Sequence, residues 1–315
     1  MKTLYIYEMG AVLSKQAGKV IVQKDGIKLW DEPMEAVEAV VVAEHTQITG
    51  QLMTRLMEKG IPVHYVKKSG AVLGSVLPNA DKNIFLRVAQ YDAWRDPEKR
   101  LAIARCVIKS KIRSQQAIAR KYQSRVYAIS KSITIMLDKY LKKADGADSV
   151  NVLSGIEGAS TNCYYDLLRE CFSGMPFTVR SRRPPGDEVN ALLSLSYMTL
   201  LPQIKTALTA KGFDAGIAYL HSIQPNRDSL ALDFLETYRA RLDNMVINWV
   251  NRLEFTARDF ERSEKEGYLL HKDAFRRFTE KFRQSAAFRD DIERYAAYFK
   301  GVLLNGEEMK PWITP

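Results

Sequence analysis

The sequence predicts an α+β protein, with a small N-terminal β-rich domain over residues 1–82 and a larger all-helical C-terminal domain over residues 83–315. Three observations predict this class. The first 80 residues contain short β-branched and aromatic runs separated by glycines, a pattern typical of strands and turns. From about Asn83 onward, apolar residues recur at helical spacing. The hydrophobic content of 46% in 315 residues supplies apolar side chains for roughly two domains.

The N-terminal part is expected to form strands around one helix. The helix covers Gln51–Lys59, where Leu52 and Leu56 share a face and Gly60 closes the C-terminus. The expected strands are the apolar runs at residues 4–7, 20–22, 37–42, 61–66 and 72–77.

The C-terminal part is expected to consist of long helices. The first helical stretch covers about 84–143 and is interrupted near Arg95-Asp96-Pro97, because proline disfavours a helix interior. Further helices are expected at residues 151–173, 187–211, 228–254 and 271–299.

The positive charge is concentrated in one segment. The chain carries a net charge of +10, which favours an anionic partner, either nucleic acid or a membrane surface, although a basic enzyme without such a partner shares this property. Residues 95–143 contain fourteen basic and three acidic residues, so this segment alone carries +11. Its basic residues, among them Lys109, Lys111 and Arg113, are expected to hold the phosphate backbone if the partner is a nucleic acid.

Other composition features exclude several classes of protein. Three cysteines without a CxxC spacing argue against a disulfide framework or a thiolate zinc site. The N-terminus has no apolar signal region, and no uncharged apolar stretch reaches the about 18 residues that a membrane span needs. We therefore expect a cytoplasmic protein with no membrane partner.

Glu157 lies in a small-residue stretch, Ser154-Gly-Ile-Glu157-Gly-Ala159. One interpretation is a capping box, in which Glu157 reaches back to the backbone N–H of Ser154 at a helix start. The other is a ligand, because a glycine on each side weakens a helix but lets a ligand approach closely.

Three further residues could carry chemistry with Glu157. His221 follows a short apolar segment, where a lone histidine is more often a satisfied core or surface residue than a ligand. Asp233 and Glu236 share a helix face at i, i+3. They form either a solvated face, with Arg239 pairing to Glu236, or a site for Mg²⁺ or Mn²⁺. Together, these four groups could converge on one metal that acts on a phosphodiester.

The loop before the helix at 187 is rich in arginine. Arg180, Arg182 and Arg183 precede Pro184-Pro185-Gly186. Guanidinium groups and a helix N-terminus both favour phosphate, whereas the alternative is a loop that pairs with surface acids.

The order of these motifs resembles the CRISPR-associated integrases, the family of CRISPR-associated protein 1. The resemblance covers about residues 1–255 and rests on four ordered motifs. They are Gly155-Ile-Glu157-Gly-Ala159, Arg182-Arg-Pro-Pro185 with Asp187-x-Val-Asn-Ala-Leu-Leu-Ser194, Leu220-His221, and Ser229-Leu-Ala-Leu-Asp233-x-x-Glu236-x-x-Arg239. Lys111-Ile112-x-x-Gln115 is also similar to the family's first long helix.

The resemblance implies a metal-dependent DNA endonuclease and integrase that inserts new spacers into a CRISPR array. It implies Mg²⁺ or Mn²⁺ held by Glu157, His221 and Glu236, with Asp233 as a fourth ligand or as a group behind the ligands. The DNA bound by such a protein would be the protospacer and the CRISPR repeat. The phosphates near the site would be held by Arg182, Arg183, Arg227 and Arg239.

The same resemblance implies the assembly. The chain would form a homodimer through its β-rich domain, which would also contact DNA, and a small ferredoxin-like adaptation protein would bridge two dimers. The pattern departs from the family at Thr237-Tyr238-Arg239, which lacks a proline, and in the loop before Asp228, where Asn226 can replace the usual glycine. Two alternatives stay open, a noncatalytic DNA-binding scaffold and a repair nuclease acting on branched DNA.

Overall fold

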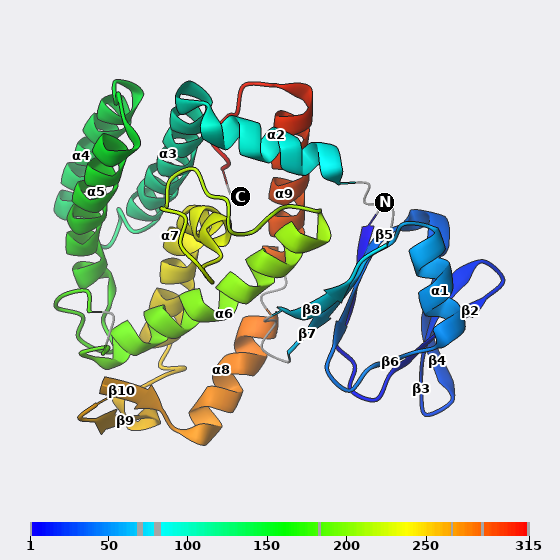
Figure 1. Ribbon diagram of the computed structural model, residues 1–315. Helices are drawn as coiled ribbons and strands as arrows, with labels where there is room; N and C mark the ends of the chain where they lie inside the picture. Colours follow the sequence, from blue (N-terminus) through cyan, green and yellow to red (C-terminus); the bar gives the residue numbers. More distant parts are fainter. Residues whose placement is uncertain are drawn as a thin grey trace.

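Strands occupy one end of the molecule and long helices the other (Figure 1). This arrangement confirms the predicted α+β class. The computed structural model describes residues 2–67, 72–78, 83–181, 184–265, 267–284 and 287–313. The domain boundary expected after residue 82 falls next to residues 79–82, which lie outside the described ranges.

Two four-stranded sheets form the N-terminal part. One has the order β1-β5-β7-β8, in which β8 runs antiparallel to β7 while the other pairs are parallel. The second has the order β4-β3-β2-β6. The elements are β1 (Lys2–Ile6), β2 (Val12–Gln16), β3 (Lys19–Lys24), β4 (Ile27–Pro33), β5 (Val37–Ala43), β6 (Gln47–Ile48), α1 (Gly50–Glu58), β7 (Val63–Val66) and β8 (Val72–Val76). Gly60 closes α1 with φ of +68°, as expected, whereas β2, β4 and β6 were not expected.

Strand β5 joins this part to the helices. Successive side chains of a strand point to opposite faces, so Val40 and Val42 enter the core of the sheets, where they pack with Leu52 of α1. Val41 faces the other way and packs with Ala210, at the end of α6 (Glu188–Ala210). Both faces of β5 are therefore covered, which explains its unbroken apolar run.

The helical part has α2 (Ile84–Arg95), α3 (Pro97–Lys121), α4 (Tyr127–Asp145), α5 (Val150–Cys171), α6, α7 (Ser229–Asn251), α8 (Lys272–Gln284) and α9 (Ala287–Asn305). The break expected near Pro97 is confirmed, because Asp96 caps α3 by accepting hydrogen bonds from the N–H groups of Glu98 and Lys99. The structure adds a second break between α3 and α4 and divides the stretch 271–299 between α8 and α9.

A small hairpin, β9 (Phe260–Ser263) and β10 (Gly267–Leu270), interrupts the helices. The helical pattern did not predict it, so the C-terminal part is mostly but not entirely helical. No helix within the described stretches is long and apolar enough to cross a membrane.

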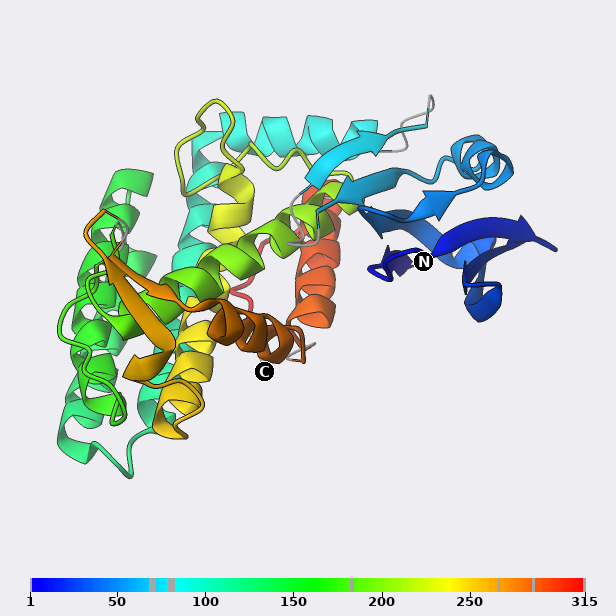
Figure 2. The same cartoon turned by 90° about the horizontal axis from the view of Figure 1, so that it is seen from below.

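Helices α3, α5 and α7 form the framework of the site. Helix α3 packs against α4, α5 and α7, and Figure 2 shows α7 enclosed by its neighbours. The C-terminal segment secures α3 from outside, since Trp312 stacks on Tyr295 and donates its backbone N–H to Ser110 Oγ at 2.8 Å.

Candidate active site

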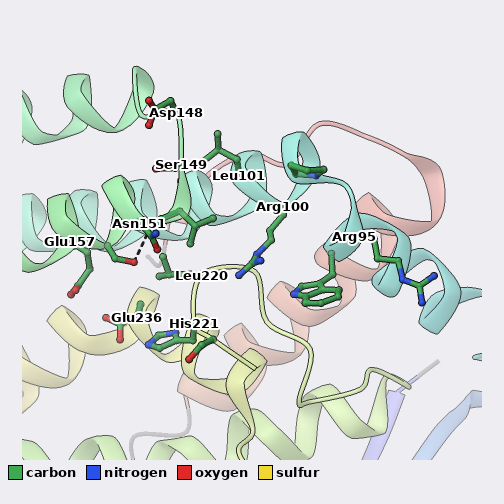
Figure 3. A pocket seen from close by; sticks show the side chains of 15 residues that line it. Arg95, Arg100, Leu101, Asp148, Ser149, Asn151, Glu157, Leu220, His221 and Glu236 are labelled. Atoms are coloured by element: carbon green, nitrogen blue, oxygen red, sulfur yellow. Dashed lines mark hydrogen bonds between the residues drawn. The ribbon is translucent and has the colours of Figure 1, made fainter. Parts of the chain in front are cut away.

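A cavity of about 650 Å³ opens where α3, α5 and α7 meet (Figure 3). Glu157, His221 and Glu236, which the sequence analysis assigned to one site, all line it. In Figure 3 these three side chains gather on one side and Arg100 points toward them from the other, whereas the guanidinium of Arg95 lies farther away and is turned from them. The remaining lining residues are Trp94, Pro97, Leu101, Asp148, Ser149, Val150, Asn151, Ser154, Leu220 and Ser222.

Asp233 organises the segment that carries His221. Its Oδ2 accepts the backbone N–H groups of Tyr219 and Leu220 at 2.7 and 3.0 Å. Its Oδ1 accepts the backbone N–H of His221 at 3.0 Å and lies 2.7 Å from Nδ1 of the same residue. This buried carboxylate accepts three backbone N–H groups, and its contact with His221 Nδ1 assigns the ring proton on that side to Nδ1. Nε2 is therefore the ring nitrogen that can bind a metal ion on the cavity side.

Glu157 lies about two turns inside α5. The helix begins at Val150, and its N-cap is Ser149, whose Oγ accepts the N–H of Val152 at 3.3 Å. Ser154 is already helical and donates its hydroxyl to Val150 O at 3.0 Å. The capping-box interpretation of Ser154 and Glu157 is therefore wrong, because the helix starts earlier than the glycines suggested.

Glu236 lies on α7 with both carboxylate oxygens engaged. Arg239 Nε donates to Oε1 at 2.8 Å and Lys111 Nζ donates to Oε2 at 2.6 Å. The expected pairing with Arg239 is present, but the carboxylate is only 5% exposed, so this helix face is not solvated. Burial by itself would raise the pKa of Glu236, yet Arg239 and Lys111 outweigh it and hold the pKa well below its usual range.

Lys111 connects the two glutamates. Its ammonium donates to Glu157 Oε1 as well as to Glu236, and its side chain is only 3% exposed. Burial would lower the pKa of Lys111, but Glu236 and Glu157 raise it, so the group stays charged. The surface contact with DNA that was expected for Lys111 does not fit this position, because the fold turns the side chain inward.

The donor set fits a divalent metal in its chemistry. Carboxylate oxygens and one imidazole nitrogen suit Mg²⁺ or Mn²⁺, and the Lys111 ammonium shows that a cation fits between Glu157 and Glu236. In this conformation, no three His, Cys, Asp or Glu side chains of the described residues form a ready metal cluster. Asp233 and Glu236 do not converge, because Asp233 turns to residues 219–221.

The other expected DNA contacts lie in different settings. The Arg239 guanidinium stacks over the Tyr197 ring at 4.7 Å and is only 17% exposed. Lys109 pairs with Asp145 at 2.5 Å. Arg113 and Arg227 are half-buried, on α3 and in the loop before α7 respectively, while Arg182 and Arg183 lie outside the described residues.

Sequence reasoning missed several residues of the site. Arg95 and Arg100 line the cavity, although the charge count had assigned them only to a general DNA-binding segment. Arg100 is held in place, since its Nε donates to Tyr219 O at 3.1 Å. Pro97 starts α3. The break between α2 and α3 at this proline could have indicated that residues before and after it line the same cavity. As expected, Asn226 takes the left-handed conformation, with φ of +58°.

Comparison with known proteins decides the family. A family model described as CRISPR associated protein Cas1 matches residues 4–284. The chain belongs to the Cas1 family. Among Cas1 relatives, the CRISPR-associated endonuclease Cas1 3 of Thermus thermophilus is 32% identical over 283 residues, which cover 87% of this chain and 82% of the relative.

Solved structures share the Cas1 fold of this chain. A partial Cas6-RT-Cas1–Cas2 complex matches with a TM-score of 0.84 at 23% identity, covering 99% of this chain and 98% of that one. A casposase bound to integration product matches with a TM-score of 0.83 at 20% identity, covering 98% of this chain and 97% of that one. The family resemblance seen in the sequence motifs is thus confirmed.

Proposed function

We propose that this protein is a divalent-metal-dependent DNA endonuclease and integrase that inserts new spacers into a CRISPR array. The observation that carries the proposal is the gathering of Glu157, His221 and Glu236 on one wall of a cavity that Arg95 and Arg100 also line. The named endonucleases among its relatives, and the integration product in the casposase structure, support the same reaction.

The residues of the cavity would have different roles in a transesterification on DNA. Glu157, His221 and Glu236 would hold Mg²⁺ or Mn²⁺. The ion would stabilise the charge that develops on the attacked phosphate and lower the pKa of the attacking hydroxyl. Asp233 fixes the imidazole tautomer and orientation of His221, and we assign it this positioning role rather than that of a fourth ligand. Arg95 and Arg100 would hold phosphates of the incoming strand.

The proposed reaction needs no outside energy source, because one phosphodiester bond forms for each one that breaks. The 3′ oxygen of the protospacer bonds to a phosphorus at the edge of the repeat, and the bond from this phosphorus to the 3′ oxygen of the cut strand breaks. The proton of the attacking hydroxyl passes to solvent or to the departing oxygen. One phosphodiester is exchanged for another, so the residues only need to align the strands and stabilise the crowded phosphate.

The exposed surface supports the proposed homodimer. Strand β8 lies at the edge of its sheet, and α2 follows it closely in the chain. Apolar side chains on both elements face solvent, namely Leu73, Val76, Ile84, Phe85 and Val88. An exposed edge strand with a neighbouring apolar patch is typical of a protein–protein interface. We propose that a second copy covers it, and that a Cas2-like ferredoxin-fold protein joins two dimers, since Cas2 accompanies Cas1 in a solved complex. Because the proposed assembly would act on DNA, we propose that it works in the cytoplasm.

One assay tests the proposed reaction. A short duplex with free 3′ hydroxyls is incubated with a repeat-containing target in Mn²⁺ or EDTA, using wild type, Glu157→Gln and the control Glu170→Gln. Glu170 is an exposed residue of the same helix. We expect joined product only with Mn²⁺, from wild type and the control.

The other outcomes separate the alternatives. No joining by wild type with intact DNA binding would favour a noncatalytic scaffold. Cutting of branched DNA without joining would favour a repair nuclease. Full joining by Glu157→Gln would contradict the assignment of the site.

A further inference from the structure

We propose that Lys111 is the resident cation of the metal-free site, and that its ammonium competes with the divalent ion for Glu157 and Glu236 and so sets the affinity for metal. This inference rests on the proposed function, because it assumes that these two glutamates are metal ligands. It adds a role for a residue that the reaction itself does not use, since Lys111 lies behind the carboxylates rather than among the residues that line the cavity.

The contacts place the ammonium where a bridging cation would lie. Lys111 Nζ donates to Oε1 of Glu157 and, at 2.6 Å, to Oε2 of Glu236. The same Oε1 of Glu157 also accepts the hydroxyl of Thr161 at 3.0 Å. Arg239 occupies Oε1 of Glu236. A divalent ion that bridges the two glutamates where the ammonium now lies would therefore replace or loosen the hydrogen bonds that Lys111 makes.

The charges lead to the same conclusion. The carboxylates of Glu157 and Glu236 are balanced by Lys111 and Arg239, so the cluster is neutral without any metal. In a buried site, like charges a few ångströms apart repel strongly because water screens them little. Adding a doubly charged ion beside the ammonium is therefore unfavourable, unless the ammonium moves away or the phosphates of DNA add negative charge.

The chemistry of lysine suits a cation that must give way. Its charge lies at the end of a flexible four-carbon chain, whereas the flat guanidinium of an arginine would hold both carboxylates in a fixed geometry. Lys109, two residues earlier on the same helix, is an ordinary surface partner of Asp145. Successive helix residues are separated by about 100°, so Lys109 and Lys111 face different directions, and Lys109 provides a matched control.

Binding of Mn²⁺ tests the proposal. The affinity is measured by calorimetry and by electron paramagnetic resonance of free Mn²⁺, on the whole protein without DNA. The variants are Lys111→Met, which removes the charge, Lys111→Gln, which also keeps hydrogen-bond donors, and the control Lys109→Met. We expect both Lys111 variants to bind Mn²⁺ at least about tenfold more tightly than wild type, because a nearby positive charge is gone, and Lys109→Met to match wild type.

Thermal unfolding gives a second measurement. Without metal, the Lys111 variants should melt at lower temperature than wild type, because two carboxylates lose their shared cation. Mn²⁺ should raise their melting temperature by more than it raises that of wild type. If both variants fold only in the presence of Mn²⁺, the metal has replaced the ammonium and the proposal holds. If neither folds even with Mn²⁺, the proposal is overturned.

A Glu157→Gln variant separates this inference from the proposed function. If wild type binds Mn²⁺ and Glu157→Gln does not, the metal site is in place. Unchanged or weaker Mn²⁺ binding by both Lys111 variants would then overturn the competition alone, because Lys111 would be aligning the ligands instead. If wild type and Glu157→Gln bind Mn²⁺ equally, the metal site of the proposed function fails, and the competition fails with it.

Discussion

Asp233 holds His221 at two points, by accepting its backbone N–H at 3.0 Å and by facing its Nδ1 at 2.7 Å on the same carboxylate oxygen. The second oxygen fixes the two preceding backbone N–H groups. This arrangement fixes the position of the imidazole at the wall of the cavity. A group that orients a metal ligand in this way is commonly nearly as important as the ligand itself.

Replacing Asp233 with asparagine should weaken Mn²⁺ binding by roughly 10–100-fold, because an amide cannot accept all of these hydrogen bonds and leaves the imidazole less fixed. Strand joining should fall in parallel, while binding of DNA without metal stays near that of wild type. The control is Asp228→Asn, which removes a charge just before the same helix, where Asp228 pairs with Lys205. Equal Mn²⁺ affinity in Asp233→Asn and wild type would remove the positioning role.

Replacing Phe85 with glutamate should convert a dimer into a monomer. Phe85 is 77% exposed and is one of the exposed apolar side chains that β8 and α2 carry. A buried charge without a partner is costly at an interface, whereas an exposed position tolerates it within about 0.5 kcal/mol of folding free energy. Sedimentation of wild type, Phe85→Glu and the control Phe275→Glu on α8 measures this. A dimer that survives in Phe85→Glu would place the interface elsewhere.

Arg95→Ala should lower both DNA affinity and its dependence on salt. Arg95 is an exposed residue at the end of α2 and lines the cavity. Loss of one phosphate contact should reduce the slope of log affinity against log salt by about one. Arg283→Ala, on α8 at the far end of the helical part (Figure 1), serves as control. A slope identical to that of wild type would mean that Arg95 touches no phosphate.

The pH dependence of folding should carry a contribution from His64. Burial lowers the pKa of His64 from 6.5 to about 4, so the unfolded chain binds a proton that the folded chain refuses. This contribution is fully present above pH 6.5 and is lost as the pH falls toward 4. Between pH 7.5 and pH 5, wild type should lose about 2 kcal/mol more unfolding free energy than His64→Gln. Urea titrations at the two pH values measure the difference, and parallel losses would contradict it.

The sequence grouped the three proposed ligands but did not reveal their surroundings. Glu157, His221 and Glu236 were grouped through the order of their motifs, and one cavity contains all three. Lys111 was assigned to the DNA-binding surface because a count of charges along a chain does not show which way each side chain faces. Lys109 and Lys111 differ by two residues, yet one pairs at the surface and the other is buried.

The fold class could be predicted from the sequence, but several turns and strands could not. Periodicity identified α5, α6 and α7 almost to their ends, because long amphipathic or buried helices repeat a strong pattern. The turn at Tyr122–Val126 contains neither glycine nor proline, so no local signal marked it. Strand β4 escaped notice because its apolar residues are few and are followed by Asp31, Glu32 and Pro33, which are typical of a loop.

Anomalous diffraction from crystals grown with Mn²⁺ tests the central claim most directly. The account predicts a Mn²⁺ peak at about 2.1 Å from oxygen atoms of Glu157 and Glu236 and from Nε2 of His221, with the ammonium of Lys111 withdrawn from between the carboxylates. Mn²⁺ bound only at other residues, with Lys111 still bridging Glu157 and Glu236, would contradict it.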